Sequence, residues 1–267
     1  LHRFLRNTGL EQPDTSKRVE WMKTTSPDKL VDVLSVMNGL LRGEEKFQRW
    51  EGKAVKSVVS IGGSAEAVDL EPPEHAEQEF TELILKIQTD VQESNMPLQA
   101  ARLYVGIIFS HMFPDGNGRT ARSVYSLIRY GKVPDTDSFV KRSSEIQRCS
   151  EAINAGGIAL LFQKEGVIEG VNDPFDEYYL TNGGVSMGMM DHVKYLAARR
   201  VLKATQETVP EVIELTSLTS EQKTGFDREY AAIRKEFFWM IQELVNHYTP
   251  TVLSMLEDAI PESDSKS

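Results

Sequence analysis

The sequence predicts an all-α fold that carries one small β-hairpin and ends in a helical C-terminal extension. Apolar residues recur every three or four positions through most of the 267 residues, which is the spacing of an amphipathic helix. β-branched sequence of the kind that forms strands is confined to residues 55–70. Residues 98–109 carry apolar side chains around most of the helix surface, so we expect this helix to be buried at the centre of the fold.

The first predicted helix follows a polar N-terminal segment, residues 1–29, which shows few periodic signals. Ser26 is a suitable N-cap, and Pro27 suits the first helical position because the amide there has no partner within a helix. Apolar residues then repeat at helical spacing: Leu30, Val33, Val36, Met37 and Leu40. This pattern predicts an amphipathic helix.

The clearest strand signal lies in the sequence VKSVVSIGG, residues 55–63. Its β-branched residues end at a Gly-Gly pair, which predicts a short strand followed by a turn. We expect residues 67–70 to form the return strand, so that the hairpin falls at about residues 53–73. A second helix is predicted over 71–92, because prolines and acidic residues open it and acidic residues favour the positive end of a helix.

Two further predicted helices enclose a loop. Pro97 begins the apolar helix, which delivers His111 at its C-terminal end. Helical character resumes over residues 118–131 and stops near Gly131. The loop at 111–118 is therefore expected between a buried helix and the N-terminus of the next helix.

The remainder of the chain, from residue 139, is mostly helical in pattern. Glycine pairs in INAGGIALLF and NGGVSMGM predict turns, and residues 229–248 form a strongly amphipathic segment. We therefore divide the chain into the N-terminal segment 1–29, a core at 30–154 and a helical C-terminal extension at 155–267.

Composition and charge exclude several classes of protein. A net charge of −10 and a pI of about 5.1 disfavour nucleic-acid binding, because an acidic surface repels phosphate backbones. Cys149 is the single cysteine, which excludes a disulfide framework and a cysteine metal cluster. The sequence has no run of about 18 apolar residues and does not open with a secretion signal. We expect no membrane partner and a cytoplasmic location, in the producing cell or, for a delivered effector, in a host cell.

The sequence HMFPDGNGRTAR, residues 111–122, gathers the residue types of a phosphate site. Glycines before a helix N-terminus form an anion site, because free amides and the helix dipole both favour negative charge. Gly116 and Gly118 allow the backbone to approach phosphate oxygens without a Cβ in the way. Asn117 is suited either to a left-handed conformation or to donating its side-chain amide to an oxygen.

Charged side chains around the loop complete the predicted site. Asp115 is a hard oxygen ligand that suits Mg²⁺ when phosphates share the coordination. Arg119 and Arg122 fall on one helix face, and their planar guanidinium groups match phosphate geometry. His111 can take a proton from an incoming hydroxyl near neutral pH. Together these residues predict a triphosphate held for attack by a protein hydroxyl.

The same stretch resembles the signature of the Fic family, His-x-Phe-x-Asp-Gly-Asn-Gly-Arg-x-x-Arg, and every fixed position is present. The resemblance covers roughly residues 30–150 and implies a Fic-type helical core with the motif between two central helices. It also implies an upstream β-hairpin called the flap, which residues 53–73 fit. The segment after residue 155 does not match a common Fic architecture.

The resemblance implies transfer of AMP from ATP to a Ser, Thr or Tyr hydroxyl of a target protein, with Mg²⁺ as cofactor. It makes His111 the base, Asp115 the Mg²⁺ ligand and Phe113 a core residue that anchors the loop. It assigns the anion hole and the contacts to the β- and γ-phosphates to Gly116, Asn117, Gly118, Arg119 and Arg122. The implied partners are ATP and a protein substrate that docks along the hairpin.

Two alternatives stay open from the sequence. The same fold could transfer another phosphate-linked group, such as UMP, phosphocholine or phosphate, although phosphate-transferring relatives depart from the Gly-Asn-Gly-Arg core that is intact here. The other alternative is a nucleotide-binding interaction module without turnover. Many Fic enzymes also carry an inhibitory helix with the pattern Ser/Thr-x-x-x-Glu-Gly/Asn. Residues 217–222 match it only in part, which we attribute to chance, and an inhibitory partner chain or a homodimer stays open.

Overall fold

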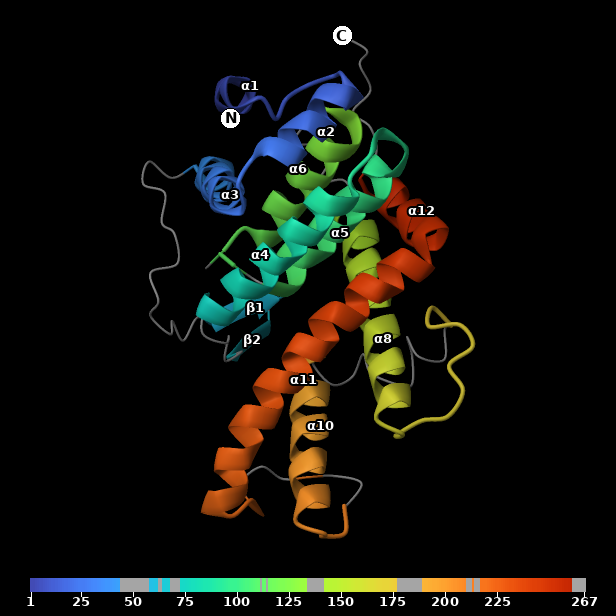
Figure 1. Cartoon of the computed structure of the whole chain (residues 1–267). Coiled ribbons are helices and arrows are strands. Elements are labelled where there is room, and N and C mark those ends of the chain that lie inside the picture. Colours follow the sequence, from blue (N-terminus) through green and yellow to red (C-terminus); the bar gives the residue numbers. More distant parts are fainter. Residues whose placement is uncertain are drawn as a thin grey trace. The chain divides into compact units, whose positions relative to one another are not determined.

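The structure is a computed structural model (Figure 1). It describes residues 1–43, 58–61, 64–67, 73–110, 112–113, 115–133, 142–176, 189–209, 213 and 217–260. The chain forms two compact units, the first containing Leu1–Ser143 with Leu253–Ser267 and the second containing Ser144–Val252. The division that the sequence suggested at residue 154 instead falls inside a continuous helix, α8 (Ser143–Lys164).

Both units are helical, as the sequence predicts. The first unit contains α1 (His2–Thr8), α2 (Thr15–Thr24), α3 (Pro27–Arg42), α4 (Pro73–Asp90), the short 3-10 helix η1 (Glu93–Asn95), α5 (Met96–Ser110) and α6 (Asn117–Tyr130). The second contains almost all of α8, together with α10 (Met189–Ala204) and α11 (Ser220–His247), and α12 (Thr249–Ala259) begins there and ends in the first unit. Within the described part of the chain, no helix has the length and apolar character needed to cross a membrane.

The N-terminal segment is more helical than its polar sequence suggests. The helices α1 and α2 occupy most of it, and their region buries only a few apolar side chains: Leu5, Leu10, Val19 and Met22. Arg18 is also buried and donates hydrogen bonds to the carbonyls of Gln12 at 2.5 Å and Pro13 at 2.9 Å. Because the apolar residues are sparse, the helical period is hard to detect in the sequence.

The predicted hairpin is present as a two-stranded antiparallel ladder. Its strands are β1 (Val58–Ile61) and β2 (Ser64–Ala67), with Ile61 opposite Ser64. The return strand therefore begins earlier than the predicted 67–70. The sequence did not reveal this start, because residues 64–66 carry no β-branched side chain of the kind that marks a strand. Its role as a flap is a separate matter and stays a prediction.

The centre of the first unit is the apolar helix α5, which packs against α6 and α4 (Figure 1). Leu103, Tyr104 and Ile107 of α5 are almost completely inaccessible to solvent. Tyr104 meets Tyr125 of α6 edge to face, with ring centroids 6.4 Å apart. This packing fixes α6, and with it the loop that opens α6, against the core of the unit.

The glycine pair Gly156–Gly157 does not form the predicted turn but lies inside α8. A Cβ at Gly157 would lie 2.6 Å from Cγ1 of Ile241, and a Cβ at Gly156 would lie 2.8 Å from Cδ1 of Leu244. The turn prediction was therefore wrong, because these glycines serve the close approach of α11 to α8. The second glycine pair, in residues 183–184, lies outside the described residues.

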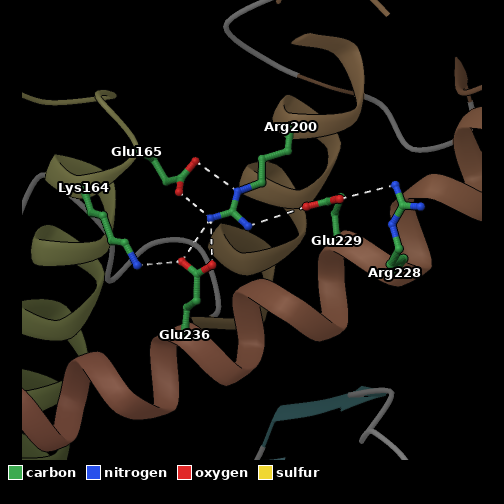
Figure 2. A network of polar contacts seen from close by, with 6 residues as sticks. All are labelled: Lys164, Glu165, Arg200, Arg228, Glu229 and Glu236. Carbon is green, nitrogen blue, oxygen red and sulfur yellow. Dashed lines mark hydrogen bonds and ion pairs between the residues drawn. The ribbon is translucent and has the colours of Figure 1, made fainter. Parts of the chain in front are cut away.

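A network of ion pairs joins α8, α10 and α11 of the second unit (Figure 2). Arg200 of α10 contacts Glu165 at 2.6 Å, just after α8, and Glu236 of α11 at 3.0 Å, and Lys164 contacts Glu236 at 3.0 Å. The hydrogen bond to Glu165 is the main reason why the pKa of Arg200 is raised. Burial alone would raise the pKa of Glu236, but the hydrogen bonds from Lys164 and Arg200 outweigh burial and lower it.

Candidate functional site

The helix α6 begins inside the motif, with its first amides directed away from the helix. Gly116 is the N-cap in a left-handed conformation, with φ of 78°, and Asn117 is the first helical residue. The first hydrogen bond of the helix runs from the amide of Thr120 to the carbonyl of Gly116 at 2.9 Å. Among the described residues, no side chain caps this N-terminus, and its first turn holds no acidic residue. The amides of residues 117–119 therefore form a cluster of donors at the positive end of the helix.

The side chain of Asn117 closes the loop behind these amides. Its Oδ1 accepts a hydrogen bond from the amide of Phe113 at 3.0 Å, and its Nδ2 donates to the carbonyl of Phe113 at 2.6 Å. The left-handed conformation, for which the sequence made Asn117 a candidate, is taken by Gly116. Since its side-chain amide is used within the loop, Asn117 offers an anion its backbone amide.

Phe113 anchors the loop in the core, as predicted. Only 2% of its surface is exposed, and the neighbouring Met112 is also buried. The two hydrogen bonds from Asn117 hold the backbone of Phe113 at the same time. The loop is thus fixed by apolar packing on one side and by a buried carboxamide on the other.

Asp115 and Arg119 are paired with each other. Nη2 of Arg119 lies 3.0 Å from Oδ2 of Asp115, and Nη1 of Arg119 donates to the carbonyl of Leu41 in α3 at 3.3 Å. The other carboxylate oxygen of Asp115 accepts a hydrogen bond from the amide of Gly116 at 2.6 Å. Both side chains are more than one third exposed, so water and salt screen this pair.

Arg122 lies along the same end of α6. A Cβ at Gly118 would lie 3.1 Å from its Nη1, so the glycine leaves room for the guanidinium group. Burial lowers the pKa of Arg122, Tyr104 raises it, and the like charge of Arg119 lowers it further. A bound anion would relieve the repulsion between the two arginines, which favours the predicted phosphate role of this helix face.

Asn38 of α3 belongs to the site, although the sequence analysis missed it. Its Nδ2 donates to the carbonyl of Asp115 at 2.9 Å and to Oγ1 of Thr120 at 3.0 Å, and only 2% of its surface is exposed. A Cβ at Gly116 would lie 2.9 Å from this Nδ2 and 3.2 Å from the aliphatic carbons of Arg42. The available signal was an asparagine in an otherwise apolar stretch of a predicted helix, where a buried amide needs partners.

His111 and Pro114 lie outside the described residues, so the role of His111 as a base stays a prediction. No group of three His, Cys, Asp or Glu side chains in the described ranges is placed to hold a metal ion. The role of Asp115 as a Mg²⁺ ligand beside phosphate oxygens and water stays a prediction. Such binding requires its Oδ2 to exchange Arg119 for the metal.

The partial match to an inhibitory helix falls at the start of α11. Thr219 is the N-cap of α11, and its side chain accepts a hydrogen bond from the amide of Gln222 at 3.2 Å. The side chain of Gln222 accepts a hydrogen bond in return from the amide of Thr219 at 2.9 Å. This reciprocal arrangement is a capping box, so Gln222, which stands where the inhibitory pattern has Gly or Asn, caps the start of α11.

Comparison with known proteins adds one match. The family model described as the Fic/DOC family matches residues 30–128, which run from α3 through nearly all of α6 and include the motif loop. Neither a search of curated proteins nor a search of solved structures found a match. Residues 30–128 of this chain thus form a domain of the Fic/DOC family, as the signature in residues 111–122 predicts.

Proposed function

We propose that this protein transfers AMP from ATP to a Ser, Thr or Tyr hydroxyl of a target protein. The Fic/DOC domain supports phosphate transfer in general. The observation that carries the finer proposal is the start of α6, where an N-terminus that no described side chain caps bears Arg119 and Arg122 within an intact Gly-Asn-Gly-Arg core. Free amides and two guanidinium groups are the donors that a polyphosphate requires.

In the proposed reaction, the amides of residues 117–119 and the guanidinium groups of Arg119 and Arg122 hold the β- and γ-phosphates of ATP. Asp115 and the phosphates would hold Mg²⁺, which when bound would further neutralise the charge that develops on the leaving group. The hydroxyl oxygen of the target forms a bond to the α-phosphorus, and the bond from that phosphorus to the bridging oxygen of pyrophosphate breaks. His111 takes the hydroxyl proton, and pyrophosphate leaves.

The hydrogen bonds within the described part of the loop support this assignment. Asn117 and Phe113 hold the loop from inside, and Gly116 permits the turn that directs the following amides outward. Donors that are fixed before the substrate arrives stabilise developing charge without reorganisation. In phosphoryl-type transfer, positioning and charge stabilisation supply most of the rate enhancement.

The test is the identity of the transferred group. The protein is incubated with Mg²⁺ and with ATP, UTP or CDP-choline in a lysate of a candidate host, and modified proteins are identified by mass spectrometry. The proposal expects a mass increase of one AMP, dependent on ATP. A UMP, phosphocholine or phosphate adduct selects a different donor on the same fold, and binding of ATP without any adduct selects a module without turnover.

A further inference from the structure

Asn38 bridges two points of the chain that are distant in sequence from it. Its Nδ2 bonds to the carbonyl of Asp115, 77 positions along the chain, and to Oγ1 of Thr120, 82 positions along. A carboxamide with 2% exposure would destabilise an apolar helix face if it lacked partners. The amide is therefore satisfied only while α3 and the start of α6 keep their present arrangement.

The two acceptors of Asn38 bracket the amide cluster. Asp115 directly precedes the N-cap Gly116, and its carbonyl belongs to the peptide group that contains the amide of Gly116. Thr120 is the residue whose amide closes the first turn onto the carbonyl of Gly116. A single buried donor thus holds both ends of the segment 116–119.

A second contact from α3 reaches the same segment. The carbonyl of Leu41 accepts a hydrogen bond from Arg119 at 3.3 Å, and the aliphatic part of Arg42 lies beside Gly116. The end of α3 therefore forms a wall along the loop. Asn38 also bonds to the backbone of the loop itself, at the carbonyl of Asp115.

We propose that Asn38 is a positioning residue, which holds the amides of residues 117–119 in the direction that binds phosphate. The proposal rests on the phosphate site of the proposed function. Asn38 is too deeply buried to be a ligand residue and acts through Asp115 and Thr120. Loss of its donor frees the backbone at Asp115 and the side chain of Thr120 from α3, so the first turn of α6 can shift and turn the amides of residues 117–119 away from the anion.

The test compares Asn38→Asp with Ser35→Ala by calorimetric titration with ATP and Mg²⁺ and with tripolyphosphate. Ser35 is the matched control, because it is also a buried polar residue of α3 but bonds only to the carbonyl of Val31 in its own helix. We expect Asn38→Asp to lower the affinity for both ligands about tenfold or more at pH 8. Ser35→Ala should leave both affinities within about twofold, as expected away from a binding site.

The pH dependence separates positioning from general loss of stability. The carboxyl group that Asn38→Asp introduces cannot donate to the carbonyl of Asp115 when it is ionised, whereas its protonated form can. Relative to wild type at each pH, the affinity of Asn38→Asp should therefore recover between pH 8 and pH 5, and that of Asn38→Ala should not. Equal affinity of Asn38→Asp and wild type at pH 8, or equal behaviour of the two variants across the range, would overturn the proposal.

Thr120→Val provides a second variant if Asn38→Asp does not fold. It removes one acceptor of Asn38 and keeps the other, so we expect a smaller loss of affinity, about threefold to fivefold. An unchanged affinity for tripolyphosphate in Thr120→Val overturns the positioning role. Wild-type protein that binds tripolyphosphate but never transfers AMP contradicts the proposed function alone, and wild-type protein that binds neither ligand overturns both.

Discussion

Arg119 and Asp115 form an ion pair across one turn at the start of α6, with Nη2 and Oδ2 3.0 Å apart. In the proposed function Arg119 binds phosphate and Asp115 binds Mg²⁺, so each side chain would exchange the other for its ligand. Exposed pairs of this kind contribute little, about 1 kcal/mol or less. Both residues can therefore exchange partners when ATP and Mg²⁺ arrive together.

Asp115→Asn should raise the affinity for ATP in the absence of Mg²⁺ by about twofold to fivefold, because it releases Arg119. The same variant should lose the gain in affinity that Mg²⁺ gives the wild type, since the metal ligand is gone. Calorimetric titration with ATP in EDTA and in Mg²⁺ measures both effects.

Arg119→Gln supplies the control through a double-mutant cycle. If Asp115→Asn only removed a negative charge near the phosphates, it would raise the Mg²⁺-free affinity equally with and without Arg119. The exchange of partners predicts a smaller gain in the Arg119→Gln background, and equal gains would contradict it.

Gly116→Ala should destabilise the first unit more than Gly43→Ala does. Both glycines have left-handed φ, 78° and 74°, so each substitution costs about 1–2 kcal/mol in backbone strain. A Cβ at Gly43 meets no described atom within 4 Å, whereas one at Gly116 would lie 2.9 Å from Nδ2 of Asn38. In urea unfolding, Gly116→Ala should lower the free energy of unfolding by about 1 kcal/mol or more beyond the loss in Gly43→Ala. Equal losses of unfolding free energy in the two variants would mean that α3 moves away from the added Cβ at no cost in stability.

Arg200→Ala should destabilise the second unit by about 2 kcal/mol at neutral pH, because it leaves Glu165 and Glu236 without their shared partner. The lowered pKa of Glu236 means that its ion pairs stabilise the fold above its ordinary pKa of 4.5 and lose this effect as the pH falls through the lowered value. The difference from wild type should therefore shrink below about pH 4.5.

Arg228→Ala is the matched control for that network. Arg228 contacts Glu229 at 3.5 Å with a side chain that is 80% exposed (Figure 2), so its removal should change the unfolding free energy little. Thermal unfolding over a pH series measures both variants. A loss in Arg228→Ala as large as that in Arg200→Ala would show that the network acts through net charge alone.

The hairpin prediction can be tested with prolines at neighbouring positions. Val59 and Ser60 lie next to each other in β1, and successive amides of an edge strand point to opposite sides, one toward β2 and the other outward. A proline removes one of these donors. If a target strand pairs with the outer edge, both Val59→Pro and Ser60→Pro should lower transfer to the target, while ATP hydrolysis at the loop suffers less.

Melting temperature controls for folding in these two variants. The variant that keeps the bond to β2 is the informative one, because its hairpin stays intact. Undiminished transfer to the target in both well-folded variants would remove the docking role from the hairpin.

The parts of the fold that were predictable have local causes. Ser26 and Pro27 mark the start of α3, and its side-chain cap is present in the structure. Continuous apolar character places α5 at the centre. By contrast, the role of Gly157 depends on Ile241 of another helix, which no local pattern reveals. The turn prediction failed there because a glycine permits close packing as readily as it permits a turn.

In the candidate site, too, the features with local causes were predictable and those that depend on distant residues were not. Its residue types are contiguous in the motif, so the sequence predicted the helix N-terminus and the arginines beside it. Asn38 was missed because its partners lie 77 and 82 positions away. The use of Asn117 within the loop was also not predictable, because an asparagine suits several roles and only the fold selects one.

The central claim is tested most directly by the fate of the phosphates of ATP. Wild type and His111→Ala are incubated with Mg²⁺ and ATP labelled at either the α- or the γ-phosphate, with a target protein identified by mass spectrometry. The account predicts that the α-label becomes bound to protein and the γ-label is released as pyrophosphate. His111→Ala should bind ATP but transfer the α-label about 10² to 10⁴ times more slowly, the usual effect of losing a positioned base. Protein-bound γ-label, or transfer by His111→Ala at the wild-type rate, would contradict it.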